Sequence, residues 1–150
     1  MSRLLAACGG FLTAVVWMDL IFDVQVLRHR RAGGVLPESV LASIAAYYRR
    51  ATTDSRPMSR LIALTMGIAV LGSVYQFVCA EDSVALRALA LVLCAAPAGL
   101  AAARVVPNAV RLGQRSDDAE VQSALARTIC RDHLVCLALI GAFTALEIAS

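Results

Sequence analysis

The chain has 150 residues, a length that corresponds to one domain. Hydrophobic residues make up 59%, charged residues only 17%, and the mean hydropathy is +0.72, which is typical of an integral membrane protein and excludes an ordinary soluble domain. The net charge of +3 does not favour nucleic-acid binding, because the 14 basic residues, all arginine, flank apolar stretches instead of forming one free basic face.

Four apolar stretches predict helices that cross a bilayer. The first stretch ends in the run Arg28-His29-Arg30-Arg31, which no hydrocarbon core would accept and which marks a membrane surface. The last stretch is the shortest of the four. The predicted spans are residues 4–27, 61–79, 84–106 and 133–148.

Two further segments are predicted to be helical outside the hydrocarbon. Residues 37–50 begin with a proline and carry apolar side chains at helical spacing, so they are expected to form an amphipathic helix along the membrane interface. Ser116 is a cap candidate followed by acids that suit the positive end of a helix, and this helix is expected to continue into the fourth span. Pro97 removes one helical hydrogen bond near the middle of the third span and is expected to kink it.

The arginines predict how the chain is oriented. Twelve of the 14 lie in the links between the first and second spans and between the third and fourth, and the exceptions are Arg3 and Arg87. Positively charged links stay in the cytoplasm, so both termini are predicted to lie outside. The fold class is therefore expected to be all-α. We predict a single transmembrane domain in the cell membrane, which would be the inner membrane in a bacterium. It is a four-helix bundle with an interfacial amphipathic helix between spans 1 and 2 and a cytoplasmic helical extension before span 4.

Two aspartates, Asp19 and Asp23, lie inside the first span. A carboxylate at membrane depth costs about 2.5–3.5 kcal/mol on insertion scales, and such residues usually face a bundle interior or an aqueous cavity. The spacing of four puts both on one helical face, so a group that satisfies one lies close to the other. Asp19 and Asp23 are therefore the centre of the predicted site and its candidate catalytic residues.

Three interpretations of these aspartates stay open. In the first, an arginine, Arg104 or Arg111, forms a buried ion pair with them and fixes the helix register. In the second, they line a polar pocket in which one carboxylate acts as proton carrier or general base. In the third, they face an aqueous cavity without defined chemistry. The residues expected at this pocket or ion pair are Trp17, Asp19, Asp23, Arg104, Asn108, Arg111 and His133.

Neither a metal nor a cofactor is predicted. His29 and His133 could join the aspartates as zinc or iron ligands, but the four residues do not occur in a ligand motif. The odd count of five cysteines, with no C-x-x-C pair, argues against a disulfide framework. A single bond between Cys8 and Cys79 stays open. Trp17 is either a packing residue or a ring in a ligand pocket.

Short motifs suggest a family. They are a glycine-bearing first span, a proline before an amphipathic segment and a proline–asparagine pair after the third span. The residues concerned are Gly9-Gly10, Leu36-Pro37, Arg56-Pro57-Met58 and Val106-Pro107-Asn108-Ala109. In this layout the chain resembles the anthrone-oxygenase-like group of small bacterial four-span proteins. The resemblance covers nearly the whole chain and implies, for some members, an oxygenase-like role on an aromatic substrate; Asp19 and Asp23 are not part of it.

A second four-span family, the membrane glutathione-transferase-like proteins, matches less well. Its arginine-asparagine-glutamate signature is missing from residues 48–54, where this chain has Tyr-Arg-Arg-Ala-Thr-Thr-Asp. Small residues four apart, such as Ala95 and Gly99, allow close helix contacts within the bundle or in a homo-oligomer. Such pairs arise readily by chance in an alanine-rich chain, so their specificity is low.

These observations predict a small polytopic membrane protein. It is expected to be a non-enzymatic component that binds a partner protein or a lipophilic ligand, with Asp19 and Asp23 in an internal polar cluster. The alternative is a small membrane enzyme, oxygenase-like, acting on a lipophilic or aromatic substrate. An ion pathway is disfavoured, because spans two to four offer few uncharged polar groups. The expected partners are the lipid bilayer, a lipophilic small molecule or membrane protein, and a second copy of the chain.

Overall fold

The computed structural model describes residues 1–32, 34–79 and 83–150, and every element in these residues is helical. The long helices are accompanied by three short helical segments: η1 (Val24–Ala32) continues α1, η2 (Arg49–Asp54) follows α2, and η3 (Ala101–Val105) joins α4 to α5. The main helices are α1 (Ser2–Asp23), α2 (Glu38–Tyr48), α3 (Arg56–Cys79), α4 (Val84–Leu100), α5 (Val106–Gln114) and α6 (Ala119–Ala149). The predicted all-α class is confirmed.

Four stretches of helix in the described residues are long and apolar enough to cross a membrane, as the sequence predicted. The fourth is longer than its predicted span, because the helical extension and the span form one uninterrupted helix, α6. Asp118 caps its start, where the carboxylate accepts a hydrogen bond from the backbone N–H of Val121 at 2.8 Å. The four stretches are Ser2–His29, Pro57–Cys79, Val84–Gln114 and Ala119–Ala149.

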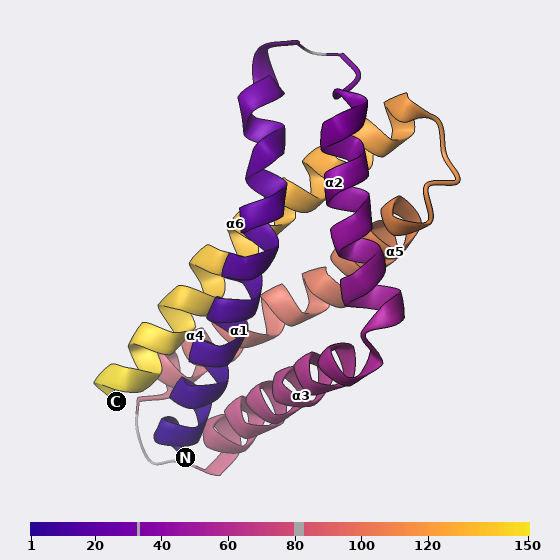
Figure 1. Cartoon of the computed structure of the whole chain (residues 1–150). Helices are drawn as coiled ribbons and strands as arrows, with labels where there is room; N and C mark the ends of the chain where they lie inside the picture. The colour runs from indigo at the N-terminus through magenta and orange to yellow at the C-terminus, as the bar shows by residue number, and fades with distance from the viewer. Residues whose placement is uncertain (33, 80–82) are drawn as a thin grey trace.

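The chain runs up and down the molecule, so that its two ends lie close together and the two arginine-bearing links lie at the opposite end (Figure 1). The links are tied to each other there. Arg115 donates to the carboxylate of Glu38 at 2.8 Å, and Arg127 donates to the carbonyl of Gly34 at 2.6 Å. We call this the arginine end of the molecule.

Helix α2 is the amphipathic helix that the spacing predicted. It runs antiparallel to the end of α1, since Ser43 bonds Gln25 and, farther along α2, Tyr48 bonds Asp23 (Figure 1). Its apolar face is buried against α5 and α6. The helix is therefore an integral part of the bundle at the arginine end, packed on the other helices rather than lying apart from them.

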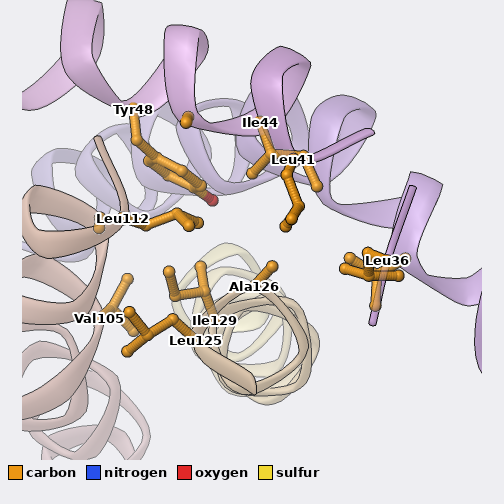
Figure 2. Close-up of a cluster of buried hydrophobic side chains, with 12 residues drawn as sticks. Leu36, Leu41, Ile44, Tyr48, Val105, Leu112, Leu125, Ala126 and Ile129 are labelled. Carbon is orange, nitrogen blue, oxygen red and sulfur yellow. The ribbon is translucent and has the colours of Figure 1, made fainter. Parts of the chain in front are cut away.

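The buried apolar side chains form two clusters. The arginine-end cluster joins α2, α5 and the first half of α6 (Figure 2), and the bundle cluster joins α1, α3, α4 and the second half of α6. The arginine-end cluster consists of Val26, Leu36, Leu41, Ile44, Ala45, Tyr48, Val105, Ala109, Leu112, Leu125, Ala126 and Ile129. The bundle cluster consists of Leu5, Cys8, Leu12, Val16, Leu20, Ala69, Ala90, Cys94, Cys136, Ile140 and Phe143.

The third membrane-length stretch changes its winding after Pro97. The α-helix passes through Pro97 and then widens into a π-helical turn, η3, before α5 begins and brings in Pro107. Such turns arise where the regular ladder of hydrogen bonds is disturbed, and proline removes a donor from that ladder. The helix stays α-helical through Pro97, where a kink was predicted, and the wide turn lies just before Pro107. Pro107 cannot donate to the carbonyl four residues earlier, which is that of Ala103 within η3. A second π-helical turn, η2, follows Tyr48.

Candidate functional site

Asp23 is the most deeply buried acid of the site, with none of its surface exposed. The hydroxyl of Tyr48 donates to Oδ1 of Asp23 at 2.6 Å, and Nδ1 of His133 lies 2.6 Å from Oδ2. The three residues come from α2, α6 and α1, so the acid joins three helices that are distant in sequence. Both oxygens of this buried carboxylate are therefore hydrogen-bonded, as burial of such a group requires.

The bond to Asp23 orients the imidazole of His133. An ionised carboxylate only accepts hydrogen bonds, so we assign the hydrogen of this bond to Nδ1. The second ring nitrogen, Nε2, then lies 3.6 Å from Oδ2 of Asp19, which is longer than a hydrogen bond. His133 is thus placed between the two aspartates that the sequence singled out, held by one and near the other.

Asp19 has a tyrosine partner of its own. The hydroxyl of Tyr47 donates to Oδ1 of Asp19 at 2.5 Å, and the ring of Tyr47 stacks on Phe22 with centroids 4.1 Å apart. Burial, reinforced by Asp19 beside Tyr47 and by Asp23 beside Tyr48, raises the pKa of both tyrosine hydroxyls. Both tyrosines therefore stay protonated and act as donors.

An apolar pocket of about 590 Å³ lies beside this polar cluster. Most of its lining is aliphatic and comes from α1, α3, α4 and α6, with further residues from both π-helical turns and α5. Asp19, Tyr48 and His133 are part of the same lining, whereas Asp23 lies behind them. A large apolar pocket with a few convergent polar groups is the usual form of a small-molecule site.

The arginines do not play the role that the sequence suggested for them. Nη2 of Arg104 lies 3.2 Å from Oδ2 of Asp132, the residue before His133. Arg111 forms a bidentate ion pair with Asp117, in which Nε and Nη2 each donate to a carboxylate oxygen at 2.7 Å. The predicted ion pair of Arg104 or Arg111 with Asp19 or Asp23 is therefore wrong. Tyrosine and histidine donors from α2 and α6 occupy the positions around the two acids, while Arg104 and Arg111 each pair with a different acid, Asp132 and Asp117.

The other predicted site residues lie elsewhere. Trp17 is 62% exposed and points away from the pocket, because two residues along a helix correspond to a rotation of about 200° from Asp19. Asn108 is half-buried on α5 but does not line the pocket. His29 bonds the backbone carbonyl of Gln25 in its own helical turn, at 3.1 Å. Of the predicted set, the structure brings together Asp19, Asp23 and His133.

Sequence reasoning did not assign Tyr47 and Tyr48 to the site, although both lie in the predicted amphipathic helix, residues 37–50. A usable signal was present, because two buried carboxylates need donors and these tyrosines follow the first span on an amphipathic helix. In the described residues no three His, Cys, Asp or Glu side chains are arranged to hold a metal ion. All five cysteines are free thiols, Cys8 buried and Cys79 exposed.

No protein-family model matches the chain, and neither does any curated protein or solved structure. The resemblance to the anthrone-oxygenase-like group therefore stays a prediction. What the protein does has to be inferred from the pocket and from the polar cluster on its wall.

Proposed function

We propose that this protein is an integral membrane protein that binds a lipophilic small molecule in the pocket between its helices. The observation that carries the proposal is the combination in one cavity of about 590 Å³ of aliphatic walls with Asp19, Tyr48 and His133. The aliphatic walls would solvate the body of the ligand, and the three polar side chains would fix the orientation of its polar group.

The outer surface supports placement in a bilayer. Large apolar side chains are exposed along the long helices, and their abundance exceeds what a water-soluble surface carries. The arginine end would then lie in the cytoplasm and both termini outside. Examples of such exposed side chains are Trp17, Leu64, Leu71, Val92 and Ile148.

Native mass spectrometry of the protein extracted with its lipids tests this function. We expect the wild-type spectrum to contain a bound small molecule that survives removal of the detergent. Ala98→Phe places a large ring at the pocket wall and should abolish this adduct. Leu71→Phe adds a ring on the exposed face of α3 and should leave the adduct unchanged. Equal occupancy in wild type and in Ala98→Phe would contradict binding in this pocket.

A second candidate function is catalysis on the bound molecule, as a small membrane enzyme. One observation favours it: Nδ1 of His133 is held by the buried Asp23 at 2.6 Å, which is how a carboxylate orients an imidazole for proton transfer. Purified protein incubated with a lipid extract of its host would then change the mass of a component. Asp19→Asn should keep binding but abolish this change, whereas a pure binding protein would produce no change at all.

A further inference from the structure

Two atoms on the polar wall of the pocket, one from His133 and one from Asp19, form no hydrogen bond with the residues that the structure describes. Nδ1 of His133 is bonded to Asp23 at 2.6 Å, and Oδ1 of Asp19 accepts from Tyr47 at 2.5 Å. The remaining two atoms, Nε2 of His133 and Oδ2 of Asp19, face each other at 3.6 Å. This distance is too long for a hydrogen bond, although both residues line the pocket.

The width of this gap suits one bridging atom from a ligand. An oxygen displaced to the pocket side can lie about 2.8 Å from each of two atoms that are 3.6 Å apart, and this is an ordinary hydrogen-bond length. Oδ2 of an ionised Asp19 only accepts, so the bridging group must donate a hydrogen bond to it. Toward Nε2 the same group must accept when the imidazole is charged, or donate when it is neutral.

A hydroxyl group meets both requirements when the imidazole is charged, whereas its single hydrogen could not satisfy both atoms beside a neutral imidazole. It donates to Asp19 and has lone pairs left to accept from Nε2 of the charged imidazole. An ether, ester or ketone has no hydrogen to donate, and a ligand carboxylate would add a third negative charge beside Asp19 and Asp23. A phenol is favoured over an alkyl alcohol, because its more acidic hydrogen forms the stronger bond to a carboxylate.

We propose that the gap between His133 and Asp19 recognises the hydroxyl group of a lipophilic phenol whose hydrocarbon part fills the pocket. The inference rests on the proposed function and names the class of ligand. Recognition involves two hydrogen bonds and no change of covalent bonds. Asp23 and Tyr47 act as positioning residues, since each holds one of the two recognising side chains and neither is the partner of the ligand itself.

The test compares 4-nonylphenol with its methyl ether, in which a methyl group replaces the hydroxyl hydrogen. Their binding to the wild-type protein in phosphatidylcholine nanodiscs is measured by titration calorimetry, with empty nanodiscs as the reference for partition into lipid. We expect the phenol to bind at least about tenfold more tightly than the ether, because the ether leaves buried polar atoms without a donor.

Variants of the protein test whether the preference for the phenol arises at the gap between His133 and Asp19. Asp19→Ala removes the acceptor and should bring the two affinities to within about threefold, mainly by weakening the phenol. Tyr47→Phe removes the hydrogen bond that positions Asp19, so it should reduce the preference to a value between those of the wild type and Asp19→Ala. Tyr75→Phe removes an exposed hydroxyl outside the pocket lining and should keep the preference. Ala98→Phe should abolish binding of both probes, which would place them in the pocket.

The outcomes separate this inference from the proposed function. Equal binding of phenol and ether to the wild-type protein would overturn hydroxyl recognition and leave lipophilic binding standing. Binding of neither probe would overturn both proposals for ligands of this size. A preference that persists in Asp19→Ala would also overturn the inference, because the hydroxyl would then be recognised elsewhere. If Asp19→Ala fails to fold, Tyr47→Phe takes its place: an unchanged preference in that variant would overturn recognition by Asp19.

Discussion

The arginine-end cluster and the bundle cluster are built from similar apolar residues but are surrounded differently. Ion pairs lie on the surface around the arginine-end cluster, among them Arg115 with Glu38 and Arg111 with Asp117. Around the bundle cluster the exposed side chains are themselves apolar, and helices approach at glycines, as α1 approaches α6 where Gly9 meets Thr144. The first resembles the core of a small soluble protein, and the second resembles helix packing in lipid.

The candidate site lies where these two regions meet. Tyr48 belongs to the arginine-end cluster, whereas Val16 and Leu20, on the same helix as Asp19, belong to the bundle cluster. At this boundary the partly buried Asp19 and the buried Asp23 each receive a hydrogen bond from α2, and Asp19 also lines the apolar pocket formed by the other helices. The arginine end thus supplies hydrogen-bond donors to the two acids, and the bundle supplies most of the pocket wall.

The largest expected effect comes from truncating a buried leucine in each cluster. Leu112 and Leu5 are both 0% exposed. Leu112→Ala should lower the free energy of unfolding by about 2–5 kcal/mol, because less apolar surface is removed from water on folding and a cavity remains in the core. Leu5→Ala should cost less, because lipid is as apolar as the core and only packing is lost. Thermal unfolding of both variants in detergent, calibrated by denaturant titration, measures the difference; equal losses would mean that both clusters meet the same solvent.

A smaller effect is expected at the boundary between the regions. Tyr48→Phe keeps the ring in the arginine-end cluster but removes the hydroxyl that donates to Asp23 at 2.6 Å. The loss should be about 1.5–3 kcal/mol, the range for a hydrogen bond to a charged group. Tyr75→Phe, on the exposed surface of α3, is the control and should unfold at the wild-type temperature. A Tyr48→Phe protein as stable as the control would show that the bond does not hold α2 on α1.

The close approach of helices at the arginine end is tested by adding one methyl group. A Cβ at Gly113 would lie 2.9 Å from the backbone nitrogen of Arg49, and a backbone atom cannot move aside as a side-chain tip can. Gly113→Ala should therefore cost about 1–3 kcal/mol. Gly141→Ala adds a methyl group in open space on α6 and should be neutral or slightly stabilising. The melting temperature of Gly113→Ala should fall below that of the wild type, whereas that of Gly141→Ala should stay the same or rise slightly. Equal melting temperatures for the two variants would contradict the close approach at Gly113.

The smallest effect concerns an exposed ion pair at the arginine end. The guanidinium of Arg111 hydrogen-bonds the carboxylate of Asp117 and lowers its pKa. Because the folded-state pKa lies below the unfolded-state value, the stabilisation is present above that value and disappears as the pH falls through the folded-state pKa. Asp117→Asn should therefore melt slightly below wild type at pH 7 and together with it in acid. Glu120→Gln, also exposed, should show no such pH-dependent gap, and a constant gap for Asp117→Asn would contradict the ion-pair explanation.

The sequence by itself determined the helical class, the four membrane-length stretches and the segregation of arginine into two links. These follow from hydropathy and helical periodicity, which are properties of neighbouring residues. It also placed Asp19 and Asp23 on one face of one helix. Trp17 is two residues from Asp19, so its position on the opposite face could have been predicted as well.

Only the tertiary structure decided which groups meet. Asp23 and His133 are 110 residues apart, and their contact depends on how α1 and α6 are rotated and docked against each other. The same packing of helices pairs Arg104 with Asp132 and places the hydroxyls of Tyr47 and Tyr48 at the two aspartates. It also forms the pocket beside them. Periodicity tells which face of a helix is buried, but every polar group on a neighbouring helix competes for a buried acid, and only the geometry of the packed helices selects the partner.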